Sequence, residues 1–431
     1  MPRRISAFAP RVMAQVLAAA AASVAAGACS PEPGAGEAAK PPAAARAAPL
    51  PTLQVAASNV ATPALPVRVC LTPEPVERLA LAIQGGCRIR AVDGGGVLDR
   101  PARLGSVTAA ATASGVRIGT REYPVSQIEV VPDAPPDLRV GDRWYRGSLR
   151  LFRRPGGKLI AVNVLPLEEY VASVVDSEMP AAFPAAARQA QAIAARTYAL
   201  YQMTTPPAHP QFDLHADVRS QKYLGYQYLD GQGRKLAGET ADGRRVAEET
   251  AGIVCTHRGK VFCTYYSAVC GGRTVRGDLV FADAAPPLVP VACDWCRAAE
   301  RYRWSNGLSG AEIAASLGDV LGGSARPLTA LRATGGVAED GSAEFVASDG
   351  VRTERVSATM LRRRLPAGVL HSPHFTVRKE GDRFVFDGRG HGHGVGLCQW
   401  GAKGQAEAGR NCLEILRHYY PGAEIVALRG E

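Results

Sequence analysis

The clearest pattern of hydrophobic and polar positions along the chain lies in residues 163–202, where two amphipathic helical repeats flank a short break. In the first repeat, apolar residues recur at the three-and-four spacing of a helix packed on a core. They are Tyr170, Val171, Val174 and Val175. The second repeat starts at Pro184, which suits a first helical position because its missing N–H would lack a partner there. The stripe of this second repeat consists of Ala187, Ala190, Ile193, Ala194 and Thr197. Its alanine side chains are small enough for another element to approach closely. The pattern predicts helices at 167–176 and 184–202.

The break between these helices, residues 177–180, carries a single acidic side chain, Glu178, just before Met179 and Pro180. A carboxyl group held between two buried helices is partly desolvated, and desolvation raises its pKa towards the range useful for a general acid. On this segment alone two interpretations are open. Glu178 is such an acid, or it is a helix-end residue whose charge favours the N-terminus of the helix that follows.

Shorter hydrophobic runs between Gly and Pro residues predict a β-rich region from Leu53 to about Leu151. Its clearest strands are expected at 67–71, 79–83 and 127–131. Strands return at 252–256 and 260–266, on either side of a three-residue turn at 257–259. Residues 304–377 contain a helix near 309–317, strands and a helix near 358–365, and we interpret them as an inserted α+β segment. The expected class is α+β, with a β-rich N-terminal part and a two-helix segment beside a mixed sheet.

The N-terminus has the order of a secretory signal. Arg3, Arg4 and Arg11 precede an uncharged, alanine-rich stretch that ends in Ala28 and Cys29. A basic head, a short apolar segment and small residues before a cysteine predict a lipoprotein cleavage site with Cys29 lipidated, and an ordinary signal peptide cut near Ala28 is the alternative. The stretch is too short and too weakly hydrophobic for a membrane span. We therefore expect an extracytoplasmic protein, either membrane-anchored or free in the periplasm or wall.

Composition adds little to this picture. The formal net charge is +10, which suits an anionic polymer as partner. It would also suit nucleic acid, but no base-stacking module or basic cluster is present and the export signal argues against it, so no nucleic-acid partner is expected.

The ten cysteines fit an oxidising compartment. With Cys29 lipidated, nine remain, and an odd number leaves at least one free thiol or ligand. Cys70 with Cys87, and Cys255 with Cys263, are candidate disulfides. The motif Cys293-Asp294-Trp295-Cys296 with Cys270 could bind zinc, but one CxxC without a second pair is a weak signal. We expect disulfides and no metal.

Alternating glycines at 390, 392, 394 and 396 surround His391 and His393. Two histidines that share a strand face are too few to hold a metal, and no acidic or cysteine partner stands at a recognisable spacing. The glycines instead indicate a backbone packed closely against a sugar or another segment. No cofactor is expected.

Seven blocks of the chain, in this order, resemble the SpoIID/LytB family of cell-wall proteins. They are 141–149 (GDRWYRGSL), 167–170 with 178–180 (LEEY, EMP), 189–199 (QAQAIAARTYA), 213–225 with Asp213, Gln221, Tyr223 and Gly225, 265–274 (YYSAVCGGRT), 390–402 (GHGHGVGLCQWGA) and 414–422 (EILRHYYPG). Two positions depart from the family pattern: His391 stands where Trp is usual, and Cys398 where Ser is usual. The block FDLHADVRSQKYLG contains His215 but no cysteine, so the zinc site that some members have there is not carried over.

The resemblance implies a lytic transglycosylase acting on peptidoglycan glycan strands, with Glu178 as catalytic acid. It places in the substrate cleft Arg196, Gln221, Tyr223, Tyr266, Ser267, His393 and Gln399. The alternative is a non-catalytic protein of the LytB kind, which binds glycan and stimulates an amidase; a structural lipoprotein scaffold is a third reading. Membrane attachment would come through the lipid on Cys29.

A single carboxylate suffices for such a reaction. Ordinary glycosidases need two, whereas here one acid can protonate the bond between N-acetylmuramic acid and N-acetylglucosamine while the muramic C6 hydroxyl attacks C1. The product is then a 1,6-anhydro-muramic end, expected on peptide-free strands. The candidates for a second acid are Asp176, Asp213 and Asp217.

We divide the chain on this reading. The expected parts are a signal peptide (1–28), lipidated Cys29 with a Pro/Ala-rich tether (29–51), a β-rich N-terminal part (52–150), the first part of the catalytic core (151–300), the inserted subdomain (301–377) and the C-terminal part of the core (378–431).

Overall fold

The computed structural model describes residues 56–61, 66–134, 136–205 and 209–429. The predicted signal peptide, Cys29 and the tether lie outside the described residues. Helices and strands are mixed along the chain, which confirms the expected α+β class. Within the described part of the chain, no helix has the length and apolar character needed to cross a membrane.

The N-terminal half forms two β-sheets that share one core. The first has the order β14 (Leu214–His215), β2 (Val67–Cys70), β13 (Lys158–Leu165), β12 (Ser148–Arg154), β9 (Gln127–Pro132), β4 (Cys87–Ala91), β5 (Val97–Asp99). The second has the order β16 (Lys235–Ala237), β15 (Gln227–Leu229), β11 (Arg143–Tyr145), β10 (Leu138–Val140), β3 (Arg78–Ile83), β6 (Gly105–Ala111), β7 (Val116–Ile118), β8 (Arg121–Tyr123). The three strands predicted here are present within a residue of their expected bounds. Buried Val, Ile and Leu residues alternate along them, as in strands with one face on a core.

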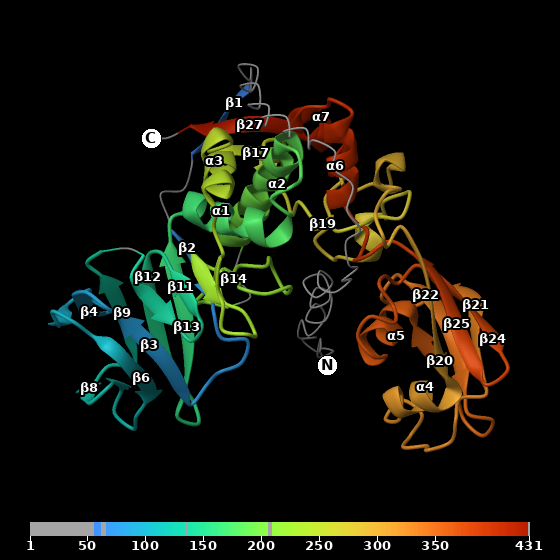
Figure 1. Ribbon diagram of the computed structural model, residues 1–431, viewed down its shortest axis with the longest axis horizontal. Coiled ribbons are helices and arrows are strands. Elements are labelled where there is room, and N and C mark those ends of the chain that lie inside the picture. Colours follow the sequence, from blue (N-terminus) through green and yellow to red (C-terminus); the bar gives the residue numbers. More distant parts are fainter. Residues whose placement is uncertain (1–55, 62–65, 135, 206–208, 430–431) are drawn as a thin grey trace, which may run out of the picture.

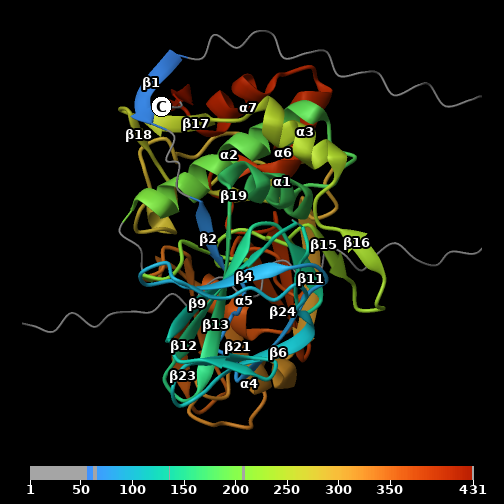
Figure 2. The ribbon, with the colours of Figure 1, turned by 90° about the vertical axis from the view of Figure 1, so that its left-hand side faces the viewer.

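A layer of helices lies above these sheets (Figures 1 and 2). It contains α1 (Leu167–Glu178), α2 (Ala185–Thr204), α3 (Ala241–Glu249), α6 (Gln399–Glu407) and α7 (Cys412–Tyr419). A sheet with the order β1 (Ala56–Ala61), β27 (Glu424–Arg429), β17 (Ile253–His257), β18 (Lys260–Val261) completes this layer.

Helix α2 is the centre of the layer. Every residue from Ala187 to Leu200 is buried, the polar ones included, so the helix is enclosed on all sides. Its alanines make this possible, because they let α1, α3, α6, α7 and β17 all contact it. The predicted helices at 167–176 and 184–202 agree with α1 and α2 within two residues.

A second lobe with its own hydrophobic core lies on the opposite side from the N-terminal sheets (orange in Figure 1). It contains β20 (Arg303–Ser309), α4 (Gly310–Ser316), β21 (Ala330–Val337), β22 (Ala343–Ser348), β23 (Thr353–Ser357), α5 (Ala358–Arg364), β24 (Phe375–Glu380) and β25 (Arg383–Arg389). Serine caps begin both helices: Ser309 accepts from Glu312 N and Ser357 from Met360 N. The core of this lobe includes Phe386, so β24 and β25 belong to it and it extends past residue 377, where the sequence analysis ended the insertion.

Between the helical layer and the second lobe lies a parallel pair of short strands, β19 (Tyr266–Ser267) and β26 (Leu397–Cys398). Two 3₁₀ turns, η1 (Gly277–Leu279) and η2 (Asp294–Cys296), lie in the segment that follows β19. This pair brings together two blocks that are 131 residues apart in sequence, and both sites described below include residues from it.

Candidate active site

Glu178 is the last residue of α1. The helix ends there because Pro180 cannot continue it, and Met179, the C-cap, donates its N–H to Val175 O. The carboxyl group is partly buried, and Lys222 N donates to its Oε1 at 2.8 Å. Burial raises the Glu178 pKa, and this outweighs the opposite effects of the Lys222 N–H and of hydrogen bonds from the Gln399 and Tyr266 side chains. The raised pKa favours a protonated carboxyl group, the form that a general acid needs.

The carboxyl group belongs to a chain of polar side chains. Tyr170 Oη donates to Gln221 Oε1 at 3.1 Å, and Gln221 Nε2 donates to Tyr266 Oη at 3.1 Å. Tyr266 in turn hydrogen-bonds Glu178. On the other side Gln399 bonds Glu178 and also donates to Gln191 Oε1 at 3.4 Å. We call this set, Tyr170, Glu178, Gln191, Gln221, Tyr266 and Gln399, the Glu178 network.

The buried polar atoms that lack a hydrogen-bond partner among the described residues include Gln191 Nε2, in this network, and Ser267 Oγ, beside it. Buried polar atoms are costly without a partner. Ser267 follows Tyr266 directly in β19, and Gln191 contacts Gln399. Both atoms therefore have unused hydrogen-bonding capacity beside Glu178.

The three candidate second acids are all held by arginines. Asp213 accepts from the Arg68 side chain at 2.6 Å and from Arg68 N at 2.9 Å. Asp176 pairs with Arg188 and accepts from Thr240 N. Asp217 pairs with Arg219 at 2.8 Å, and although burial raises the Asp217 pKa, the Arg219 bonds outweigh it and the pKa is lowered. No such ion pair holds Glu178 among the described residues, so it differs from all three.

The His-Gly segment packs against the strand that carries Ser267. Gly392 has φ +102°, and a Cβ there would lie 2.9 Å from Ser267 Cβ. Gly396 has φ +70°, and a Cβ there would lie 2.0 Å from Tyr265 O. Of the two expectations for these glycines, the structure supports close packing on another segment.

His393, in the same segment, is neutral at physiological pH because burial lowers its pKa to about 3. Its Nδ1 accepts from Val395 N at 3.1 Å, so the neutral ring carries its proton on Nε2. His393 faces Phe281 edge-on, with ring centroids 5.0 Å apart. The ring can donate one hydrogen bond and cannot supply a positive charge.

Two residues that the resemblance placed in the cleft lie in the interior instead. Arg196 has no exposed surface, and its guanidinium bonds Glu168, Ile253 O and Ala247 O. Tyr223 is 1% exposed and donates to Asn163 Oδ1 at 2.8 Å. Their polar atoms are used for packing α2, α3 and β13, which leaves no group for a sugar. Sequence reasoning did not name Gln191, which belongs to the Glu178 network. Its position lies in the 189–199 block that resembles the family, so that block was the signal that could have pointed to it.

The expected disulfides are also absent, since the nine cysteines of the described chain are all free. Cys70 in β2 and Cys87 in β4 lie in one sheet, but β13, β12 and β9 separate them, a span of about 19 Å at 4.8 Å per strand. The turn after β17 has two residues, not three: Arg258 and Gly259 have φ 52° and 73°, and His257 pairs with Lys260. This register places Cys255 opposite residue 262, so Cys263 projects from the other face.

Four other cysteines do come together. Cys270, Cys293, Cys296 and Cys398 are all buried, and their sulfur atoms lie within 4.8 Å of one another. They form the one set of at least three Cys, His or acidic side chains in the described chain that could hold a metal ion.

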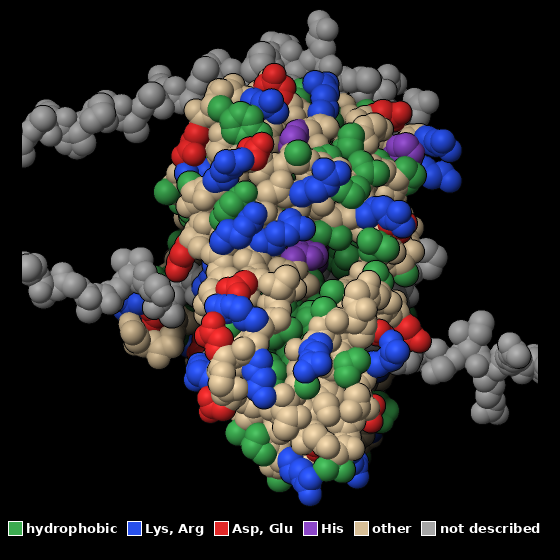
Figure 3. Space-filling view, turned by 90° about the vertical axis from the view of Figure 1, so that its right-hand side faces the viewer, with side chains coloured by type: hydrophobic (Ala, Val, Ile, Leu, Met, Phe, Trp, Pro, Cys, Tyr) green, Lys and Arg blue, Asp and Glu red, His purple; other side chains and the backbone are tan. Residues whose placement is uncertain are grey.

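A wide cleft lies elsewhere, between the segment that follows β19 and the second lobe. It has a volume of about 1110 Å³, and its lining includes Arg273, Arg276, Arg303, Trp304, His374 and Arg389. On this side of the molecule Lys and Arg side chains gather across the middle of the surface (Figure 3). The cleft contains no residue of the Glu178 network, although it adjoins the His-Gly segment, where Val275 N donates to Gly394 O.

Comparison with known proteins agrees with the sequence blocks. Residues 155–257 match the family profile described as "Stage II sporulation protein". An uncharacterized protein of Brachyspira hyodysenteriae is 32% identical over 282 residues, covering 65% of this chain and 72% of that protein. Stage II sporulation protein D of Bacillus subtilis is 29% identical over 273 residues, covering 62% of this chain and 76% of that protein. The amidase enhancer of Bacillus subtilis is 26% identical over 300 residues, covering 59% of this chain and 40% of the enhancer.

Proposed function

Because the chain belongs to the SpoIID/LytB family of cell-wall proteins, we propose that it is an exported lytic transglycosylase of peptidoglycan. In this proposal it cleaves the bond between N-acetylmuramic acid and N-acetylglucosamine in peptide-free glycan strands. The observation that carries the proposal is the state of Glu178: a carboxyl group with a raised pKa, held by Gln399 and Tyr266 without an arginine partner in the described chain. A carboxylate locked to an arginine would hold its proton only at low pH.

Glu178 performs both proton transfers. Protonated Glu178 donates its proton to the glycosidic oxygen as the bond from C1 of the muramic residue breaks. The hydrogen bonds from Gln399, Tyr266 and Lys222 N stabilise the carboxylate that this step leaves. The muramic C6 hydroxyl then attacks C1, and Glu178 takes up the hydroxyl proton. The ring closes to a 1,6-anhydro end, and the acid returns to its starting form without consuming water.

The groups around Glu178 support contact with a sugar. Ser267 Oγ and Gln191 Nε2 are buried polar atoms without a partner among the described residues, and sugar hydroxyls would supply one. His393 bonds the Tyr266 backbone through its ring and so holds the strand that carries Ser267. The arginines of the neighbouring cleft suit the lactyl carboxylates of peptide-free muramic acid. We therefore propose Ser267, Tyr266 and Gln399 as substrate contacts and assign His393, Arg196 and Tyr223 to the supporting fold.

A second candidate function is stimulation of an amidase without cleavage. The observation that favours it is the likeness to the amidase enhancer, of which this chain matches 40%. Such a protein would bind glycan and meet a wall amidase but would not need a protonated Glu178. In either case we propose that a lipid on Cys29 and the tether of residues 29–51 hold the protein at the membrane within reach of the wall.

Product analysis separates these functions. The purified chain is incubated with peptide-free glycan strands in heavy-oxygen water, bound strands are measured, and new ends are identified by mass spectrometry. We expect anhydro-muramic ends without the label. Labelled reducing ends would mean hydrolysis with a second acid, binding without new ends would favour the amidase enhancer, and neither binding nor cleavage would leave a structural scaffold.

A further inference from the structure

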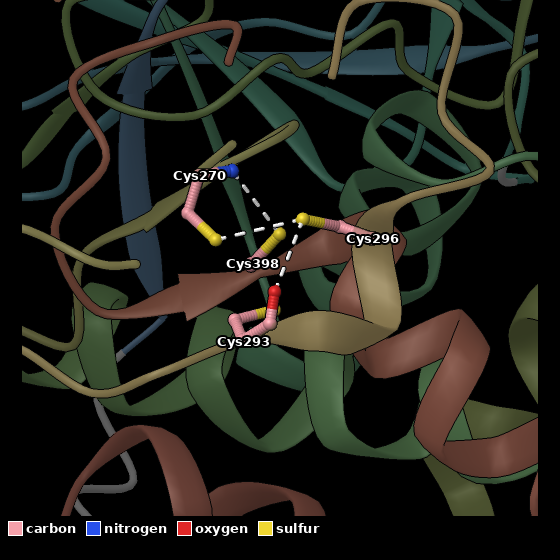
Figure 4. A group of neighbouring side chains, drawn as sticks. All are labelled: Cys270, Cys293, Cys296 and Cys398. Carbon is pink, nitrogen blue, oxygen red and sulfur yellow. Dashed lines mark hydrogen bonds between the residues drawn. The ribbon is translucent and has the colours of Figure 1, made fainter. Parts of the chain in front are cut away.

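The four clustered cysteines come from three segments far apart in sequence. Cys270 lies in the loop after β19, Cys293 and Cys296 lie at the two ends of η2, and Cys398 ends β26 (Figure 4). All four side chains point to one centre, and their sulfur atoms lie within 4.8 Å of one another. We call them the four-cysteine cluster.

The spacing of the sulfur atoms fits a shared metal ion better than disulfides. Cys270 Sγ lies 3.6 Å from Cys296 Sγ, whereas a disulfide needs about 2.05 Å. A tetrahedral zinc ion with Zn–S bonds of about 2.3 Å sets its ligands about 3.8 Å apart. A disulfide between two of these cysteines would also turn their sulfur atoms away from the other two. Here all four sulfur atoms are close enough to one another to bind the same ion.

The surroundings supply the donors that thiolate ligands need. Cys270 N and Gly401 N each donate to Cys398 Sγ at 3.3 Å, and Tyr419 Oη lies 3.1 Å from Cys293 Sγ. Hydrogen bonds of this kind orient ligands and stabilise their negative charge. The fit is tight as well, because a Cβ on Gly401 would lie 2.6 Å from Cys293 Sγ.

Other cysteines of the chain show what simple burial looks like. Cys255 and Cys412 are fully buried, the usual place for a free cysteine. Neither belongs to a group that could hold a metal ion in the described chain. The four-cysteine cluster therefore differs from Cys255 and Cys412 in the short distances between its sulfur atoms and not in burial. Cys412 is a matched control for this reason.

We propose that Cys270, Cys293, Cys296 and Cys398 bind one structural Zn²⁺ ion as a closed tetrahedral site. Four soft sulfur ligands in a tetrahedron are typical of zinc, and with all four positions taken by protein the ion has no open place for substrate. The site joins β19, η2 and β26. Since Cys398 precedes Gln399 and Cys270 lies three residues after Ser267, the ion fixes the two segments that bring these side chains towards Glu178.

Zinc content tests the proposal without reference to cleavage. Metal analysis and native mass spectrometry of the purified full chain are expected to give about one zinc per chain, the stoichiometry of a single site. The four thiols should resist alkylation in the folded protein until a chelator removes the ion. Replacing zinc by Co²⁺ should give the thiolate-to-metal absorption of a tetrahedral sulfur site.

Variants locate the ion. Cys296→Ser and Cys398→Ser should each lose more than about nine-tenths of the bound zinc, because a missing ligand typically costs far more than the tenfold to hundredfold of an outer partner, whereas Cys412→Ser should keep it. A metal-free wild-type chain, with either disulfides or four reactive thiols, would overturn the proposal. So would zinc retained by Cys296→Ser. If a variant does not fold, the wild-type stoichiometry and its chelator-dependent alkylation still decide.

Discussion

The Glu178 network and the four-cysteine cluster are built on the same pair of strands, β19 and β26, and they differ in how completely their side chains satisfy one another. In the network Gln191 Nε2, and beside it Ser267 Oγ, have no partner among the described residues. In the cluster, four sulfur atoms lie within 4.8 Å of one another, Cys398 Sγ accepts from backbone N–H groups, and Tyr419 Oη lies beside Cys293 Sγ. Polar atoms without a protein partner can still bond to a ligand. Four sulfur atoms that could share one metal ion would instead hold their segments together. The first region is suited to chemistry and the second to support.

The largest expected effect is on cleavage, at the Glu178 network. Glu178→Gln keeps the size and hydrogen bonding of the side chain but removes the proton, so cleavage should fall by about 10²–10⁴-fold, the usual contribution of a general acid. Glycan binding should be retained, and the folded state should not be destabilised. Release of anhydro ends measures the effect, and Glu248→Gln, an exposed residue on α3, is the control. Near wild-type cleavage by Glu178→Gln would end the catalytic assignment.

At the four-cysteine cluster we expect a loss of thermal stability instead. Zinc present at 100–1,000 times its dissociation constant stabilises the fold by about 3–4 kcal/mol, and each kcal/mol shifts the melting temperature of a domain of 150–250 residues by about 2–4 °C. Chelation or Cys398→Ser should therefore lower the melting temperature by roughly 10 °C. Calorimetry with and without chelator measures this, with Cys412→Ser as control. An unchanged melting temperature in chelator would show that the two regions do not differ in this way.

The sequence predicted these two regions unequally. The helical stripes are local patterns, so α1 and α2 were predicted within two residues, whereas the role of Glu178 stays a prediction from the family resemblance. The cluster joins Cys270 to Cys398 across 128 residues through the β19–β26 pairing, which no local pattern reveals, and in the sequence Cys398 is only a departure from the usual Ser. Arg196 was misplaced because a motif says which residue is present and not which way it points.

A smaller effect is expected from Tyr266→Phe. The change removes one hydrogen bond to Glu178 and leaves Gln221 Nε2 without its acceptor, a loss of about 1–2 kcal/mol, or about tenfold in cleavage. Because the Tyr266 bond lowers the Glu178 pKa, its removal should also move the fall of activity at high pH to higher pH. The pH profile of kcat/KM checks this, and Tyr228→Phe on β15 is the control. A tenfold loss with an unmoved profile would place Tyr266 in packing only.

The smallest effects are opposite shifts in stability at two carboxyl groups. Burial raises the Glu178 pKa in the folded protein, so folding carries no penalty below the pKa of the unfolded chain and loses stability as pH rises through the folded pKa. The Asp217 pKa is lowered, since Arg219 outweighs burial, and its contribution is present above the unfolded pKa and lost as pH falls through the folded pKa. At pH 7 Glu178→Gln should therefore raise the melting temperature by a few degrees and Asp217→Asn should lower it. Both differences should shrink as the pH is brought towards 3. A destabilised Glu178→Gln at pH 7 would mean that this carboxyl group is held for the fold, like the aspartates, and not kept ready for a proton transfer.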